Sequence, residues 1–306
     1  MIININIYIM ELTKEIREDV KKKKPNLSNQ SIVTYGSILK SVYQHVFPDN
    51  KYDIKLFDDT DVVINYLKDL EPNKRKTILS ALVAITGKKE YRVLMLKDIE
   101  KYVEDEHKQE KNEKQDESWV SMDKVRALYN ALQSDANTIY KKDKYKMSDL
   151  QEIQDYIIMS LLGGIYIPPR RSKDYVNFKI SDIDKNEDNY MSKSTLIFNS
   201  YKTAKTYGVQ KVEAPPELKK ILSKWIKINP TNYLLFDSHG NQLSNVKLTQ
   251  RLNKLFGKNV SVNQLRHTYL SDKYQSTIDI NKALEKDMNE MGSSTKQQKV
   301  YIKSDS

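Results

Sequence analysis

The sequence predicts a protein of two domains that is mainly α-helical, with a small antiparallel sheet in its second half. Three observations support this prediction. The chain has 306 residues, which exceeds the usual size of one domain. Apolar residues recur at helical spacing through most of its length. The short runs that are typical of paired strands gather between residues 175 and 212.

The first domain is expected to be a small helical bundle at residues 11–106. Its apolar residues lie three or four positions apart, which is the pattern of helices that bury one face. Pro25 and Pro48 each end a helix, because proline cannot continue one. The expected helices are residues 11–24, a second one between these two prolines, residues 59–70, one that starts at Glu71-Pro72, and residues 91–106.

Residues 1–10 precede this bundle and are expected to form an N-terminal arm. The stretch alternates Ile with Asn, and it lacks the basic region that begins a signal peptide. A short strand, a flexible arm, or codons upstream of a start at Met10 all fit this pattern.

A charged linker is predicted at residues 107–118. The run from Glu104 to Glu117 contains no apolar residue, and charges of both signs are interspersed along it. This run is the clearest domain boundary in the sequence, so the second domain is expected at residues 119–306.

The second domain begins with helices and continues into the small sheet. Ser121 can cap a first helix, and the strongly apolar run from Leu150 to Leu162 forms another that stops at Gly163-Gly164. Pro168-Pro169 then forces an extended segment. The expected strands are residues 175–180, 195–198 and 208–212, and the expected later helices are residues 217–228, 244–256, 262–274, 278–288 and 293–301.

The composition favours a polyanionic partner. The formal net charge is +10, from 51 Lys and Arg against 41 Asp and Glu, and nucleic acid is the commonest partner for such a chain. A lysine-rich genome is the alternative explanation. The absence of cysteine excludes thiol catalysis, cysteine-based zinc sites and disulfides. Four histidines do not favour a His-rich metal centre, and no apolar run approaches the length of a membrane span.

One basic cluster lies in the first domain. Lys74, Arg75 and Lys76 stand at the start of a predicted helix, where backbone N–H groups and the helix dipole favour phosphate groups. A solvated basic face explains the same cluster equally well.

Four segments of the second domain carry residues suited to chemistry. Arg171 lies in PPRRSKDY and is followed three positions later by Asp174. Lys202 lies in YKTAKTYG before a predicted hairpin turn, and Arg266 lies in NQLRHT. Tyr301 ends the segment MGSSTKQQKVY. In their order and flanks these segments resemble the boxes of the tyrosine recombinase (phage integrase) superfamily. The PPRR variant of the first box is similar to integrases of virophages and large DNA viruses.

The resemblance implies a catalytic domain that cuts DNA through a 3′-phosphotyrosyl intermediate, with Tyr301 as the nucleophile. Arg171 and Arg266 would bind the non-bridging oxygens of the phosphate, for which planar guanidinium groups are suited. Lys202 would protonate the leaving 5′-oxygen, with Lys205 as the rival. The resemblance further implies no metal or other cofactor, a homo-tetramer on paired sites in duplex DNA, and no membrane.

The sequence departs from the family at its accessory positions. Asn263 stands where the second box usually has a histidine, and Gly292, with Ser293 beside it, stands where His or Trp is usual. Water, Asp174 or a partner protomer would have to replace them. His267 follows Arg266, but on a helix the two side chains point about 100° apart, so His267 is expected to serve packing.

The resulting hypothesis is a soluble, intracellular site-specific DNA recombinase or integrase of a virus or mobile element, acting wherever its DNA lies: nucleus, cytoplasm or viral factory. Arg170 and Lys205, with the basic cluster of the first domain, would contact DNA. A type IB topoisomerase or telomere resolvase shares the chemistry and is an alternative. A DNA-binding accessory protein with a degenerate catalytic domain is the alternative from another class.

Overall fold

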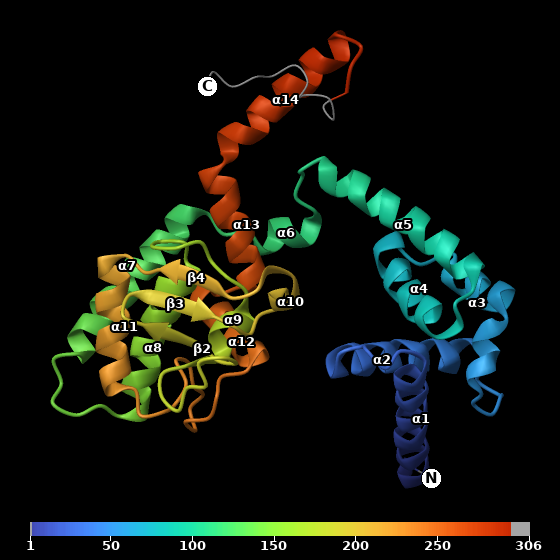
Figure 1. Ribbon diagram of the computed structural model, residues 1–306, viewed down its shortest axis with the longest axis horizontal. Helices are drawn as coiled ribbons and strands as arrows, with labels where there is room; N and C mark the ends of the chain where they lie inside the picture. Colours follow the sequence, from blue (N-terminus) through green and yellow to red (C-terminus); the bar gives the residue numbers. More distant parts are fainter. Residues whose placement is uncertain (1, 295–306) are drawn as a thin grey trace. The chain divides into compact units, whose positions relative to one another are not determined.

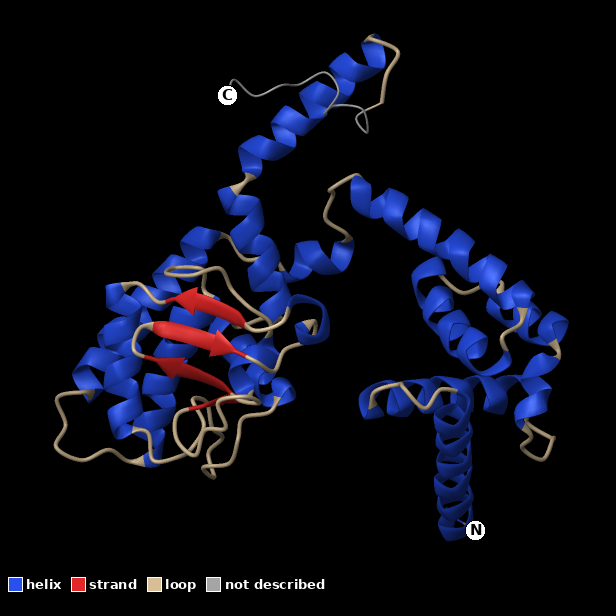
Figure 2. Ribbon diagram, in the orientation of Figure 1, coloured by secondary structure: helices blue, strands red, loops and turns tan. Residues whose placement is uncertain are grey.

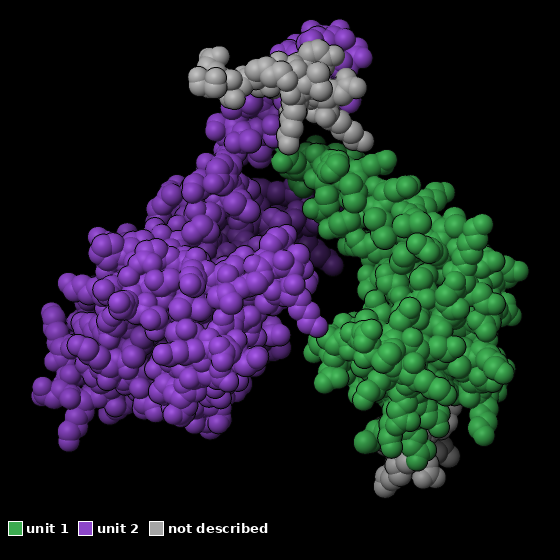
Figure 3. Space-filling view, viewed as in Figure 1, with its two compact units in different colours: residues 1–110 green, residues 111–306 purple. Residues whose placement is uncertain are grey.

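A computed structural model describes residues 2–294, with side chains from Met10 onward. The chain divides into two compact units, residues 1–110 and residues 111–306, which Figure 3 colours separately. The division falls inside the charged run that the sequence marks as a linker.

Unit 1 is a bundle of helices, as predicted (Figure 1). Ser28 caps α2 by accepting a hydrogen bond from the Ser31 amide, and Asp59 caps α3 in the same way through the Val62 amide. The elements are α1 (Ile2–Lys23), α2 (Asn29–Val46), the 3-10 helix η1 (Ile54–Asp58), α3 (Thr60–Leu67), α4 (Pro72–Thr86) and α5 (Lys89–His107).

The expected arm at residues 1–10 is not separate from the bundle. The backbone of α1 is helical from Ile2, so the first helix begins well before Glu11. A helix propagates easily once its first turn exists, and the buried stripe of Leu12, Ile16 and Val20 supplies that stable part.

The core of unit 1 joins its helices through aromatic and aliphatic side chains. Phe57 and Tyr91 are fully buried, and the Tyr91 hydroxyl donates a hydrogen bond of 2.7 Å to the Phe57 carbonyl. Leu67 and Leu82 are buried in the same cluster. The hydroxyl of Tyr91 therefore ties the 3-10 helix to α5.

An ion pair between α4 and α5 adds a polar contact to this apolar core. Arg75 Nη2 lies 2.6 Å from Asp98 Oδ1, and Arg75 Nε donates to the other carboxylate oxygen at 2.8 Å. The Asp98 side chain is only 3% exposed. The bidentate contact neutralises a charge that burial would otherwise strongly disfavour.

Unit 2 sets a small sheet among helices (Figure 2). Gly163 ends α8 and Gly257 ends α12, while Pro216 begins α11. The elements are α6 (Glu113–Ser118), α7 (Met122–Ile139), α8 (Met147–Leu162), α9 (Ser172–Val176), β1 (Phe178–Lys179), β2 (Asn189–Ser192), β3 (Thr195–Phe198), α10 (Ala204–Tyr207), β4 (Gln210–Glu213), α11 (Pro216–Ile228), α12 (Asn245–Phe256), α13 (Val262–Lys273) and α14 (Gln275–Glu290). The helix expected at residues 293–301 lies almost wholly outside the described residues.

The sheet is mixed, and the prediction of an antiparallel sheet is wrong in this respect. Its strand order is β1-β2-β3-β4; β1 pairs with β2 in parallel, and the other two pairs are antiparallel. Strand β2 is not among the expected strands, and the strand expected at residues 175–180 overlaps residues that form α9. Strand β2 is hard to predict because it begins at Asn189, a residue type that is typical of turns but is here fully buried. The Asn189 side-chain amide donates to the Asp174 and Ser200 carbonyls, both at 2.9 Å, and so fixes the start of β2 between two neighbouring segments.

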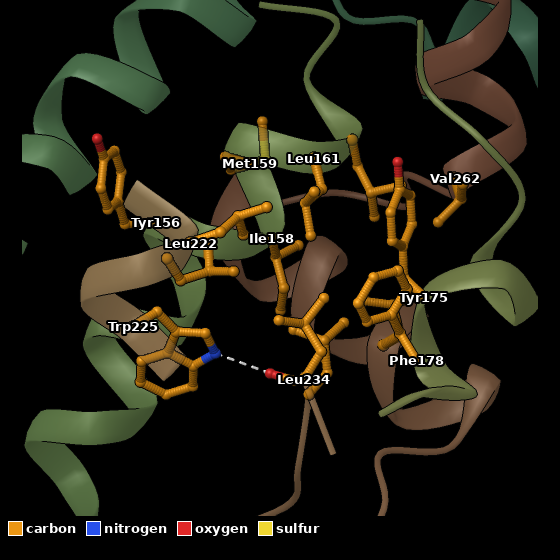
Figure 4. Close-up of a cluster of buried hydrophobic side chains, with 14 of the residues drawn as sticks. Tyr156, Ile158, Met159, Leu161, Tyr175, Phe178, Leu222, Trp225, Leu234 and Val262 are labelled. Carbon is orange, nitrogen blue, oxygen red and sulfur yellow. Dashed lines mark hydrogen bonds between the residues drawn. The ribbon is translucent and has the colours of Figure 1, made fainter. Parts of the chain in front are cut away.

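The core of unit 2 surrounds α8, which is buried on most of its surface. Trp225 from α11 is fully buried; its ring stacks on Phe236, and its indole N–H donates to the Leu234 carbonyl at 2.8 Å (Figure 4). Tyr175 and Phe178 complete this cluster from the α9–β1 segment. The apolar contact places the residues just before α9 next to the core.

The Arg75–Asp98 pair provides a stability test. In Arg75→Ala the Asp98 carboxylate stays buried without its partner, so the free energy of unfolding of unit 1 should fall by about 3–5 kcal/mol. Far-UV circular dichroism during denaturant unfolding reports both units. Tryptophan fluorescence reports unit 2, because both tryptophans, Trp119 and Trp225, lie there. The loss of stability in Arg75→Ala should appear in the circular dichroism curve and not in the tryptophan fluorescence curve.

Lys88→Ala is the matched control in the same unit. Its ion pair with Asp58 is 3.7 Å long and exposed on both sides, so its loss should cost less than about 1 kcal/mol. Equal shifts for the two variants would contradict a stabilising role of the buried pair.

Candidate active site

A pocket of about 490 Å³ in unit 2 brings the predicted arginines together. Arg171 comes from the turn before α9, and Arg266 comes from α13. Asp174, at the start of α9, is the carboxylate among the lining residues. The lining is completed by Pro168, Pro169, Arg170, Tyr201, Thr203, Tyr207, Gln210 and Val212.

A glycine fixes the two arginine-bearing segments relative to each other. Gly164 follows α8 with φ of +70°, a conformation that residues with a side chain rarely adopt. A Cβ atom built there would lie 2.5 Å from the ring of Tyr269 on α13. The absence of a side chain therefore lets α13 approach the segment that leads into Pro168 and Arg171.

The charges in the pocket act on one another. Burial raises the pKa of the Asp174 carboxyl, and the positive charges of Arg170, Arg171 and Arg266 oppose that rise. Burial lowers the pKa of the Arg266 guanidinium, and the neighbouring charge of Arg171 lowers it further. The two arginines thus repel each other in the free protein, which favours an anion between them.

Arg170 is held inside the protein. Its Nε donates to Asp174 Oδ2 at 2.9 Å, its Nη1 donates to Gln210 Oε1 at 2.7 Å, and its guanidinium lies 4.0 Å from the centre of the Phe198 ring. Arg170 was expected to contact DNA. In the structure it joins α9 to strands β3 and β4. Its spacing of four residues from Asp174 was the available signal.

Lys202 and Lys205 lie beside the pocket. Both side chains are exposed, and the lining contains their neighbours Tyr201 and Thr203 instead. The Tyr201 hydroxyl donates a 2.6 Å hydrogen bond to the Gly208 carbonyl, which fixes the turn that carries both lysines. The expected turn at residues 203–208 contains the short helix α10.

Asn263 orients Arg266 on α13. Its Oδ1 accepts a hydrogen bond of 3.1 Å from Arg266 Nη1, and its amide nitrogen lies 3.3 Å from His267 Nε2. His267 is exposed, so the packing role expected for it is not what the structure shows. The three side chains form a row on one helix, with the guanidinium at the pocket.

Gly292 has a structural role of its own. It follows α14 with φ of +69°; its amide donates to the Asn289 carbonyl at 3.0 Å, and the Ser293 amide donates to the Met288 carbonyl at 2.8 Å. These two bonds define a Schellman motif, the helix ending that favours glycine. The helix ending thus accounts for a glycine at a position where the tyrosine recombinases usually have His or Trp. Tyr301 lies outside the described residues.

The three residues of the basic cluster in unit 1, Lys74, Arg75 and Lys76, differ in exposure and in the groups they contact. Lys74 is exposed, and the Lys76 ammonium lies 3.0 Å from the centre of the Tyr102 ring. Arg75 is bound to Asp98 by the ion pair described above. Its charge is therefore already matched within unit 1.

Two further observations concern the described residues only. Among them no group of three or more His, Cys, Asp or Glu side chains could hold a metal ion. No helix in this part of the chain is long and apolar enough to cross a membrane.

The structure is similar to a crystal structure of lambda integrase, residues 75–356, solved as a dimer bound to a COC′ core site. The TM-score is 0.44 and the sequence identity is 12%, over 88% of this chain and 90% of the other. No family model matches the sequence. No curated protein matches it either.

The Schellman ending of α14 can be tested by substitution. Gly292→Ala places a Cβ atom in a left-handed backbone conformation, which should cost about 1–2 kcal/mol and loosen the last turn of α14. Hydrogen exchange of the amides at residues 287–293 should then become faster. Gly292→Asn is the control, because Asn adopts this conformation more readily. Equal exchange in both variants would contradict the role given to Gly292.

Proposed function

We propose that the protein is a site-specific DNA recombinase or integrase that cuts and rejoins DNA through a 3′-phosphotyrosyl intermediate. The observation that carries the proposal is the meeting of Arg171 and Arg266 in one pocket. They come from segments far apart in the sequence, and each lies in a segment that resembles a box of the tyrosine recombinases.

The charge of the pocket suits a phosphodiester. Arg170 forms an ion pair with Asp174, so these two largely cancel. Arg171 and Arg266 remain as the positive charges of the lining. Charge develops on the two non-bridging oxygens as the phosphate is attacked, and guanidinium groups fixed in place stabilise it by about 10²–10³ in rate for each donor.

In the proposed reaction Tyr301 attacks the phosphorus atom. A bond forms between its phenolic oxygen and phosphorus, and the bond from phosphorus to the 5′-oxygen breaks. With a pKa near 10, only about one tyrosine in a thousand is ionised at pH 7, so the phenolic proton must be removed. Asn263 cannot accept it. Asp174 Oδ1 is buried and has no hydrogen-bond partner among the described residues, which makes it the available acceptor in the pocket.

Lys202 is our choice for the general acid that protonates the leaving 5′-oxygen. Its exposed side chain starts beside the pocket, on the turn held by the bond from Tyr201 to Gly208. Bound DNA would cover this turn and bring the ammonium group close to the leaving 5′-oxygen, to which it can donate a proton. Lys205 lies three residues after Lys202 on the same turn and is the alternative general acid.

The partner in this proposal is duplex DNA, with a homo-tetramer assembled on paired sites. The net charge of +10 would supply salt-dependent affinity for the backbone. The same chemistry serves a type IB topoisomerase or a telomere resolvase, which need no pairing of recombination sites.

A second candidate is a DNA-binding accessory protein that no longer cuts DNA. Two observations favour it. Asn263 is engaged by Arg266, and Gly292 ends a helix, so neither position offers the accessory imidazole or indole of the family.

A covalent adduct distinguishes the two candidates. Incubation with nicked suicide substrates that carry candidate sites should leave the protein attached to the 3′ end of the cut strand. Tyr301→Phe should abolish the adduct, because phenylalanine lacks the phenolic oxygen that forms the bond to phosphorus. Tyr274→Phe, which changes an exposed tyrosine of unit 2, is the matched control and should leave the adduct unchanged. No adduct on any cognate DNA would favour the accessory protein.

The role of Lys202 has its own test. Lys202→Ala should slow cleavage of normal DNA by about 10²–10⁴, the usual contribution of a general acid. A 5′-phosphorothiolate leaving group needs no proton, so this substrate should restore the rate. Lys205→Ala is compared on the same two substrates. Rescue of Lys205→Ala but not of Lys202→Ala would move the general acid to Lys205.

A further inference from the structure

A groove of about 470 Å³ lies in unit 1, where α1 packs against α2 (Figure 1). Its volume falls in the range of roughly 300–1,000 Å³ that is usual for ligand sites in proteins. Helix α1 reaches the core of the unit through Leu12, Ile16 and Val20, and none of these three residues lines the groove. The groove is therefore a second surface of α1, separate from the one that holds the bundle together.

The groove contains aliphatic surface that unit 1 leaves uncovered. Val33 on α2 is 39% exposed and Met10 on α1 is 73% exposed, and both line the groove. The buried Ile32 adds to the same apolar surface. Because aliphatic side chains of two helices meet in one concave place, a partner that covers them with an apolar group gains free energy.

The same groove carries positive charge. Lys14, Arg17 and Lys21 line it from α1, and their spacing of three and four residues puts them on one side of that helix. Glu18 is the only acid among the described lining residues, and its carboxylate lies 4.0 Å from the Lys14 ammonium. The net charge of the lining favours an anionic partner.

Arg17 lies across α2 and has an unused donor. A Cβ atom at Gly36 of α2 would lie 2.6 Å from Arg17 Cγ, so the arginine stem crosses α2 at a position without a side chain. Glycine inside a helix is unfavourable relative to alanine, and here it makes room for the arginine. The Arg17 Nε atom is buried without a hydrogen-bond partner among the described residues. A buried donor without an acceptor is costly, so an acceptor supplied by a partner would stabilise the contact.

These features together select a carboxylate that stands beside an aliphatic side chain. A carboxylate can accept two parallel hydrogen bonds from a guanidinium group, and the aliphatic side chain would cover Val33 and Met10. Phosphates of duplex DNA could meet the lysines, but a sugar–phosphate backbone has no aliphatic side chain to place on the apolar surface.

We propose that the groove between α1 and α2 binds a peptide segment of another protein, in which Asp or Glu stands beside large aliphatic residues. The carboxylate pairs with Arg17, and the aliphatic residues lie on Val33 and Met10. This gives unit 1 a protein partner in addition to the DNA proposed above. The inference rests on unit 1 alone and does not require the chemistry proposed for unit 2.

Fluorescence anisotropy with labelled synthetic peptides and the full chain tests this proposal. The first peptide repeats the unit Leu-Leu-Glu-Glu, the second has Ser in place of Leu, and the third has Lys in place of Glu. The first peptide should bind. The other two should bind at least about tenfold more weakly, because one lacks the aliphatic groups and the other lacks the carboxylates.

Substitutions locate the binding in the groove. Arg17→Ala should weaken binding of the first peptide about ten- to hundredfold, the usual contribution of a hydrogen bond to a charged group. Arg92→Ala removes an exposed arginine of α5 in the same unit and should leave the affinity unchanged. Val33→Asp puts a carboxylate into the groove and should abolish binding of the first peptide. Because Val33 is exposed, this second variant tests the groove without removing a core residue.

Equal affinities for the Leu–Glu and Ser–Glu peptides would mean that charge alone acts, and would overturn the proposal. Equal losses in Arg17→Ala and Arg92→Ala would do the same. Absence of binding by the first peptide would also overturn it, and weaker binding of duplex DNA by Arg17→Ala and Val33→Asp would then assign the groove to nucleic acid. The covalent adduct expected of unit 2 is measured separately, so either proposal can fail while the other stands.

Discussion

The candidate site depends on how unit 2 accommodates one buried carboxylate. Asp174 is 2% exposed, and a carboxylate in that position is strongly disfavoured unless a positive group compensates it. Arg170 provides that compensation, and Gln210 and the ring of Phe198 hold the guanidinium in place. One side chain thus connects the turn before α9 to two strands of the sheet. Arg171 can line the pocket because Arg170, and not Arg171, forms the ion pair with the Asp174 carboxylate.

The helices could be predicted because their apolar residues repeat over many positions. The stretch from Leu150 to Leu162 and the stretch from Glu217 to Ile228 both form helices close to the expected bounds. The sheet was harder, since its strands are two to four residues long and their pairing is set by contacts distant in sequence. Asn189 illustrates the difficulty: its residue type suggests a turn, and its buried hydrogen bonds decide for a strand.

The candidate site was predictable in part for the same reason. Motif order indicated Arg171 and Arg266, and both line one pocket. Motif order could not show that Arg170 is bound to Asp174, because an arginine pair in a sequence does not reveal which member is buried. Nor could it show that Asn263 holds Arg266, or that Gly292 serves the end of α14. Both positions have local structural roles that residue type and motif order do not reveal.

The close contact between Gly164 and Tyr269 has a consequence for how this site can change over generations. A side chain at position 164 would meet a left-handed backbone and the ring of Tyr269 at once. A change at Tyr269 would relieve the steric contact but not the backbone strain at position 164. No single second substitution would therefore make a side chain acceptable there. Gly164 does not line the pocket, yet it limits how closely α13 approaches the segment that leads into Arg171, so we expect evolutionary change around the pocket to occur at positions other than 164.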